Sequence, residues 1–184
     1  MEKQYTMSVL TEDKAGLLNN LTIILTRRKI NIDSLNVSTT EVKGISRFTI
    51  VVTTSKDKVD NCVKQFRKLI DVLGAFVYEE DEVYYQELAL YKVPTSVFLN
   101  GNKIETLVRN NGARILVIEA DHIIIEKTGH MEDTQDLYRK LEPLGLLEFV
   151  RSGRVAISKS KRKTEAYIKE LEETRSNELS IKDY

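Results

Sequence analysis

The order in which hydrophobic periodicities follow one another is the feature that most constrains how this chain folds. A strand buried on one face alternates apolar and polar side chains, whereas an amphipathic helix repeats its apolar side chains every three or four residues. The first part of the chain reads as strand, helix, strand, strand, helix and strand by this criterion. These six segments are residues 5–10, 17–29, 30–42, 45–52, 56–70 and 71–78.

The same order recurs, more loosely, in the remainder of the chain. The segments there are residues 83–93, 97–111, 114–120, 122–128, 131–144 and 146–150, with a short strand at 155–158 added to the end. Two runs of strand, helix, strand, strand, helix, strand predict an α+β protein made of two consecutive ferredoxin-like βαββαβ domains. We place the first domain at 1–80 and the second at 83–160, and expect a polar tail with helical spacing at 161–184.

Composition excludes several classes of function. The 28 basic side chains balance the 28 acidic ones, so nothing in the net charge favours nucleic acid or anionic lipid as a partner. No apolar run approaches the length of a membrane span. The lone cysteine, Cys62, cannot form an internal disulfide, which favours a cytoplasmic protein. One cysteine and two histidines also make a structural metal site improbable.

The familiar catalytic motifs are absent, which argues against an enzyme. The chain has no phosphate-binding loop, dinucleotide fingerprint, zinc-protease motif or nucleophile elbow. Cys62 falls on an apolar helix stripe and is expected in the core. His122 and His130 fall in a hairpin turn and before a helix, where turn or capping roles are expected. The acidic run 79–82 suggests a solvated edge rather than a cation site.

The turn between the first strand and the first helix is more informative. Gly16 at a helix start lets a ligand approach the backbone, where free N–H groups favour a carboxylate. Asp13 could accept hydrogen bonds from an ammonium group, so the pair suits a zwitterion. The alternative is that Asp13 caps the helix and Gly16 eases the turn. Asn31, at the helix-to-strand turn, has two interpretations as well: the turn favours Asn for conformational reasons, or the amide of Asn31 contacts a ligand.

Several motifs in this region carry a resemblance to a known family. They are the S-V-L opening, the Gly-Leu-Leu helix start, R-R-x-x-N-I-x-S-L and S-R-F-T-I-V-V, followed by KQFRKLIDVL. In that order they closely resemble the regulatory ACT domain of the acetolactate synthase small subunit. The resemblance continues through ELALYKV, GARILVIEADHIIIEKTG, LEPLGLLEFVRSG and VAISK, so it covers roughly residues 5–160.

The resemblance implies a non-catalytic subunit that binds and activates a large catalytic subunit and confers feedback inhibition by a branched-chain amino acid, chiefly valine. The large subunit would carry thiamine diphosphate, magnesium and FAD, with no cofactor on this chain. Two ACT domains would pair edge to edge and hold the effector between them. The implied effector residues are Asp13, Gly16 and Leu17 on one side, and Asn31 and Ile32 on the other.

Two positions depart from the family pattern. Asp13 stands where the family more often has Asn, and Lys29 stands where many members have Gly.

An alternative to the regulatory subunit, from a different class of function, is a free-standing amino-acid sensor that acts on another partner. An RNA-binding module of the same strand order is disfavoured because the third strand, ISRFTIVV, has a single aromatic residue and no glycine. An enzyme of ferredoxin-like fold is also disfavoured, because the sequence shows no nucleophile paired with a base.

Overall fold

The computed structural model of the chain describes residues 2–98, 103–161 and 169. It divides into two compact units, which we describe separately. The first contains the chain up to Tyr84 together with the described residues from Ala156 onward, and the second extends from Tyr85 to Val155. The predicted tail at 161–184 lies, apart from Lys161 and Lys169, outside the described residues.

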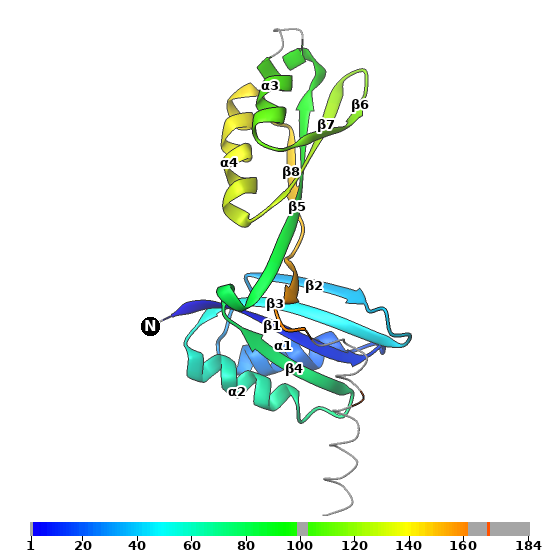
Figure 1. The fold of residues 1–184 in the computed structure, drawn as a ribbon, viewed down its shortest axis with the longest axis vertical. Coiled ribbons are helices and arrows are strands. Elements are labelled where there is room, and N and C mark those ends of the chain that lie inside the picture. The colour runs from blue at the N-terminus through cyan, green and yellow to red at the C-terminus, as the bar shows by residue number, and fades with distance from the viewer. Residues whose placement is uncertain (1, 99–102, 162–168, 170–184) are drawn as a thin grey trace, which may run out of the picture. The chain divides into compact units, whose positions relative to one another are not determined.

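The first unit has the predicted ferredoxin-like topology. Its four strands form one antiparallel sheet in the order β2-β3-β1-β4, and both helices lie on the same side of that sheet (Figure 1). The elements are β1 (Lys3–Glu12), α1 (Leu17–Arg27), β2 (Ser34–Thr39), β3 (Ile45–Thr54), α2 (Lys56–Phe66), β4 (Val72–Tyr78) and the 3-10 turn η1 (Glu80–Glu82). Strand β2 is therefore an edge strand, and β4 is the other edge of the described sheet.

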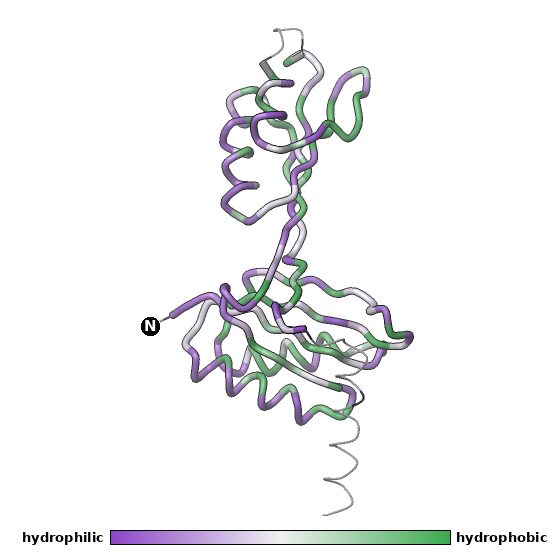
Figure 2. Tube along the Cα trace, in the orientation of Figure 1, coloured by the Kyte–Doolittle hydropathy of each residue, from purple (hydrophilic) through white to green (hydrophobic). Residues whose placement is uncertain are grey.

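The core of the first unit lies between the sheet and its two helices. Alternate residues of β1 point into this core. The apolar stripes of α1 and α2 cover them, and Figure 2 shows apolar and polar stretches following one another along each helix. The fully enclosed side chains include Met7, Leu21, Leu25, Ile50 and Phe66. Cys62 is also fully buried, as its place on the apolar stripe indicated.

The second unit repeats the topology with strand order β6-β7-β5-β8. Its elements are β5 (Val83–Pro94), the 3-10 turn η2 (Thr95–Phe98), α3 (Lys103–Asn110), β6 (Arg114–Ile118), β7 (His122–Gly129), α4 (Met131–Leu141), the 3-10 turn η3 (Glu142–Leu144) and β8 (Glu148–Arg151). Strand β9 (Val155–Ser158) pairs with β5 and belongs, from Ala156 onward, to the first unit. Buried Tyr91, Ile123, Ile125 and Leu137 form its core with residues of α3. The two-domain ferredoxin-like class is thus confirmed.

The helices are shorter than the hydrophobic patterns suggested. Helix α2 ends at Phe66, and Ile70, which the pattern placed in the same helix, is 80% exposed. The helix expected over 97–111 begins as a 3-10 turn, and the α-helical part starts at Lys103, after residues 99–102, which are not described. None of the described helices is long and apolar enough to cross a membrane.

Candidate functional site

The start of α1 is an open helix terminus. Gly16 occupies the N-cap with φ +88°, a left-handed conformation that glycine adopts without steric cost, and no side chain caps the helix there. A Cβ built on Gly16 would meet no atom within 4 Å, so the space beside this backbone is unoccupied by the described chain. The next residue, Leu17, is 3% exposed and anchors the helix in the core. The first N–H groups of a helix have no intrahelical acceptor, so they are available to an anion.

Asp13 holds the turn in place and does not cap α1. Its backbone N–H donates to the Gly44 carbonyl at 2.8 Å, and its Oδ1 accepts a hydrogen bond from the Ser46 hydroxyl at 3.0 Å. Both partners belong to the β2–β3 hairpin or its turn, so Asp13 ties the helix entrance to the neighbouring strands. The capping interpretation of Asp13 is wrong, because the N-cap position falls three residues later, at Gly16.

A second anchor comes from Lys14. Its ammonium group contacts Glu12 Oε2 at 2.5 Å and Asp71 Oδ1 at 3.0 Å, and the backbone N–H of Glu12 donates to the Asp71 carbonyl at 3.0 Å. Hydrogen bonds to Glu12 and then Asp71 raise the pKa of the Lys14 ammonium above its usual value. The turn that presents Gly16 is therefore fixed to the chain that enters β4 as well as to the hairpin.

The opposite end of α1 closes with a Schellman motif. The Ile30 N–H donates to the Leu25 carbonyl and the Lys29 N–H to the Thr26 carbonyl. Lys29 has φ +54°, and it is the single non-glycine residue with a positive φ in the described chain. The left-handed position of this turn is therefore Lys29 and not Asn31. The conformational interpretation of Asn31 is wrong.

The remaining two predicted site residues follow directly after this turn. Asn31 is exposed, whereas Ile32 is partly buried against the core of the first unit. The next residue, Asp33, donates its N–H to the Val51 carbonyl at 2.8 Å and accepts a hydrogen bond from the Thr53 hydroxyl at 2.7 Å. The entry into β2 is thus fixed to β3, with the Asn31 side chain left at the surface.

Within one chain, the structure places the two groups of predicted residues at opposite ends of α1. The helix has 11 residues, which corresponds to a length of roughly 16 Å at 1.5 Å per residue. Asp13, Gly16 and Leu17 lie at its beginning, and Asn31 and Ile32 follow its end. No single amino acid can contact both groups on one protomer. A site that contains both predicted groups would therefore need a second copy of the chain.

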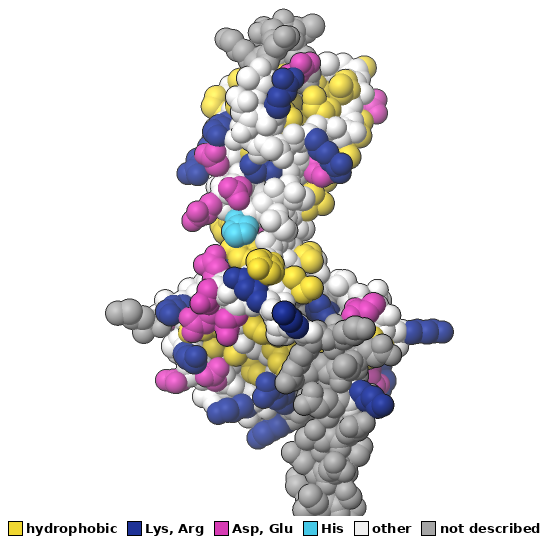
Figure 3. Space-filling model, in the orientation of Figure 1, with side chains coloured by type: hydrophobic (Ala, Val, Ile, Leu, Met, Phe, Trp, Pro, Cys, Tyr) yellow, Lys and Arg dark blue, Asp and Glu magenta, His cyan; other side chains and the backbone are white. Residues whose placement is uncertain are grey.

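The other chemistry-bearing residues serve structural roles. His130 is the N-cap of α4, where its backbone N–H donates to Asp133 Oδ2 at 3.0 Å, as the capping expectation had it. The acidic run 79–82 forms the turn η1, and Glu79 pairs with Lys3 at 3.1 Å. Among the described residues, no group of His, Cys, Asp or Glu side chains is arranged to hold a metal ion. Acidic and basic side chains are interspersed over the visible surface, without a basic patch (Figure 3).

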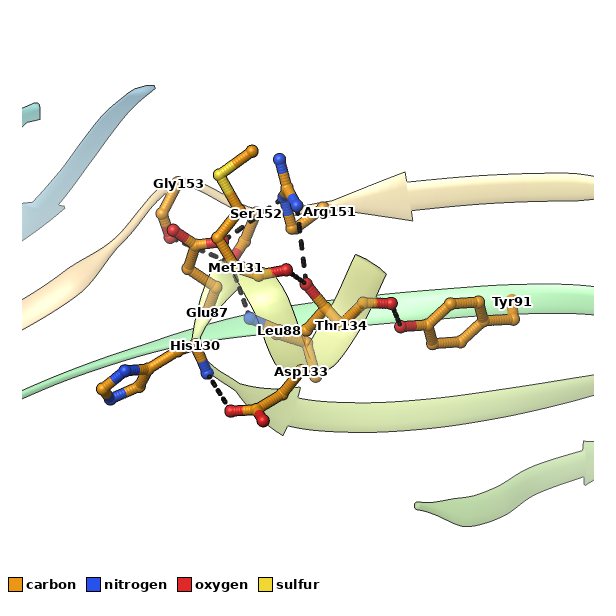
Figure 4. A network of polar contacts seen from close by, with 10 residues as sticks. All are labelled: Glu87, Leu88, Tyr91, His130, Met131, Asp133, Thr134, Arg151, Ser152 and Gly153. Carbon is orange, nitrogen blue, oxygen red and sulfur yellow. Dashed lines mark hydrogen bonds and ion pairs between the residues drawn. The ribbon is translucent and has the colours of Figure 1, made fainter. Parts of the chain in front are cut away.

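A polar network in the second unit was not indicated by the sequence. Glu87 on β5 is only 6% exposed and lies 3.3 Å from Arg151 Nε of β8, while Arg151 Nη1 is 3.5 Å from the Thr134 hydroxyl of α4 (Figure 4). The Tyr91 hydroxyl donates to the Thr134 carbonyl at 2.6 Å, and burial raises the pKa of Tyr91 to about 12. Each of these side chains contacts another element of the same unit, although Glu87 Oε2 meets Arg151 as an ion pair and accepts no hydrogen bond from the described residues. The network fixes α4 to the sheet and offers no nucleophile and base.

Comparisons with known proteins match both units. The family described as "AHAS small subunit-like ACT domain" matches residues 7–74, and "Small subunit of acetolactate synthase" matches residues 86–160. The acetolactate synthase small subunit of Mycolicibacterium smegmatis is 39% identical over 158 residues, which cover 86% of this chain and 92% of the relative. That of Bacillus subtilis is 31% identical over 160 residues, covering 86% and 91%.

A solved structure shares the fold. The crystal structure of the acetolactate synthase small subunit from Thermotoga maritima matches with a TM-score of 0.78 and 25% identity, covering 87% of this chain and 99% of that one. The topology of both units, the matches to both family descriptions and the similarity to relatives over nearly their whole length agree. The chain belongs to the acetolactate synthase small subunit family.

Proposed function

We propose that this chain is the regulatory subunit of an acetolactate synthase in branched-chain amino acid biosynthesis. It has no catalytic activity of its own, activates a large subunit that carries thiamine diphosphate, magnesium and FAD, and confers feedback inhibition by valine or a related amino acid. The observation that carries the proposal is family membership across both units, together with an open helix terminus at the position where the resemblance puts the effector carboxylate.

The electrostatics of α1 support an anionic ligand group at Gly16. Helices α2, α3 and α4 each have an acidic residue in the first turn, whereas α1 has none. An acidic side chain there would already satisfy the positive end of the helix dipole and would repel an incoming carboxylate. The backbone N–H groups that follow Gly16 are thus free of an acidic competitor in the first turn of the helix. Asp13, with one oxygen bonded to Ser46, has a second oxygen for the effector's ammonium group.

The surface beside α1 supports a homodimer formed through the first unit. Strand β2 is an edge strand, and its last three residues are exposed. The outward face of α1 carries exposed Leu18 and Ile23, and β2 carries exposed Val37, whereas the exposed residues of α2 are polar. Pairing two copies along this edge would cover these apolar side chains. It would also bring Gly16 of one protomer toward Asn31 and Ile32 of the partner, which completes a site that neither chain has alone.

Reconstitution with the cognate large subunit tests the proposal. Condensation of pyruvate should be slow for the large subunit alone, absent for this chain alone, and faster when the two are mixed. Valine, leucine and isoleucine are then titrated separately, and at least one should reduce the stimulated rate. Failure of this chain to bind the large subunit would favour the alternative of a free-standing amino-acid sensor with another partner.

A further inference from the structure

A cavity of about 450 Å³ lies in the first unit, on the face of the sheet that α1 and α2 leave uncovered. Its floor is formed by the outward residues of β1, β3 and β4, and its other wall by Val83, residues 156–158 and Ser160. Figure 1 shows β9 lying over this face of the sheet. The space corresponds to roughly 15 water molecules, counted at about 30 Å³ each. It is large enough for a small organic molecule.

A hydrogen bond holds the returning segment in position over the sheet. The Lys159 N–H donates to the Glu82 carbonyl at 3.0 Å, and Ser158 lines the cavity together with Tyr78 on β4. The floor is shielded from bulk water, since Thr6 is 2% exposed and Thr49 is 5% exposed. The sheet and the returning segment therefore bound the cavity on two sides.

The lining combines one cation with hydroxyl groups and an apolar side. Arg47 on β3 contributes a half-buried guanidinium, which has five N–H donors and remains charged at any physiological pH. Hydroxyl groups come from β1, β3, β4 and the returning segment, and Leu10, Phe76 and Ile157 contribute apolar surface. The acidic lining residue, Glu41, is exposed, so water screens its charge more than that of Arg47.

From this lining we propose that the cavity is a second ligand site, separate from the α1 turn, for a small monocarboxylate with a branched or aromatic apolar tail. The guanidinium of Arg47 pairs with the carboxylate in its fork geometry. The hydroxyl groups of Thr6, Ser8 and Thr49 donate to the remaining carboxylate lone pairs. The tail packs on Phe76 and Ile157. The positive charge of Arg47 in the lining argues against a cation as the occupant.

The test uses the full-length chain and 3-methylbutanoate as the probe, followed by amide chemical shifts. Addition of the probe should shift the amides of residues 6–10, 47–49 and 156–160. The neutral analogue 3-methylbutan-1-ol and the cation 3-methylbutylamine should bind at least tenfold more weakly. Valine should shift residues 13–17 and 29–32 instead. An equal response to acid, alcohol and amine, or probe shifts confined to the α1 turn, would overturn the proposal.

Matched variants separate the charge of Arg47 from its contribution to folding. Arg47→Met keeps the length of the side chain and should weaken probe binding about ten- to a hundredfold, while Arg47→Lys should lose less. Arg114→Met removes an exposed arginine of the second unit and should leave probe binding unchanged. If Arg47→Met fails to fold by circular dichroism, Ala156→Phe, which places a ring against the cavity wall, should block the probe. Full binding by a folded Arg47→Met or Ala156→Phe variant would refute the site.

Discussion

The two units have one topology but differ in how the chain enters their helices. In the first unit, β1 leads into α1 through a four-residue turn that ends in Gly16 at positive φ, with no side-chain cap and no acidic residue in the first turn. In the second, β5 leads through the turn η2 before α3 begins at Lys103, and α4 starts with a capping box of His130 and Asp133. The shared fold therefore does not determine where a ligand binds. The two units differ instead in the chemistry of their helix starts, on which the proposed effector site depends.

The units also differ in what they bury. The core of the first unit is an apolar cluster of aliphatic and aromatic side chains that includes the single cysteine. The second unit encloses Glu87, at 6% exposure, and Arg154, at 3%, whose guanidinium lies 3.6 Å from the centroid of the Tyr85 ring. Charges removed from water are retained at a cost in stability unless they are paired, so the second unit relies on specific polar contacts in addition to its apolar core.

The largest effect is expected from cavities made in either core. Leu21→Ala in the first unit and Leu137→Ala in the second each remove a fully buried side chain, and each should lower the free energy of unfolding by about 3 kcal/mol. Amide hydrogen exchange, measured separately for the two units, should be faster in residues 3–78 for the first variant and in residues 86–151 for the second. Equal acceleration in both units by either variant would show that they unfold together.

A smaller effect is expected from Tyr91, which distinguishes the second unit. Burial favours the neutral phenol, so the folded pKa of about 12 lies above the unfolded value of about 10. The resulting stabilisation is complete below pH 10 and is lost as the pH rises from 10 toward 12. Tyr91→Phe should remove on the order of 1–2 kcal/mol at pH 8 and flatten this alkaline loss. Urea unfolding at pH 8 and pH 11 measures the free energy of unfolding of the variant and the wild type. Tyr84→Phe is the control, because Tyr84 is 67% exposed.

The smallest effect concerns the end of α1 and is stabilising. Lys29 occupies a left-handed position, which costs a residue with a Cβ about 1–2 kcal/mol. Lys29→Gly should remove this cost, and after the greater chain entropy of glycine the net gain should be about 0.5–1 kcal/mol. Thermal unfolding should then show a higher Tm for the first unit. Lys29→Ala keeps the left-handed backbone strain and should give no gain in stability. A gain equal to that of Lys29→Gly would show that the effect comes from removing the charge of Lys29.

The sequence predicted the fold well because both units follow simple periodicities. Alternation in β1 correctly separated Tyr5, Met7 and Val9, which face the helices, from Thr6 and Ser8. The helix ends were less predictable, because an apolar residue such as Ile70 extends a stripe whether or not the helix continues. The return of the chain after Val155 to the first unit involves pairing between residues far apart in sequence, which no local pattern reveals.

The candidate site was only partly predictable. Glycine before a helical stripe correctly indicated the left-handed N-cap at Gly16. The hydrogen bond between Asp13 and Ser46 joins residues 33 positions apart, and short-range spacing carries no signal for it. The buried pair of Glu87 and Arg151 was missed for the same reason. An acidic residue at an inward position of a strand with strict alternation was the available hint.

The most direct test of the effector site is a valine titration of the reconstituted holoenzyme with two variants at one position. Gly16→Asp and Gly16→Asn both place a side chain at φ +88°, so they share the backbone strain, which Asp and Asn tolerate better than other residues. They differ because Asp, unlike Asn, places a negative charge beside the N–H groups that would bind the effector carboxylate. Loss of a charge-assisted hydrogen bond should raise the valine concentration for half-inhibition about ten- to a hundredfold in the Asp variant relative to Asn.

Stimulation of the large subunit should persist in both variants, and circular dichroism should show both folded. Equal valine sensitivity of the Asp and Asn variants, at wild-type level, would contradict the account by removing the start of α1 from the effector site.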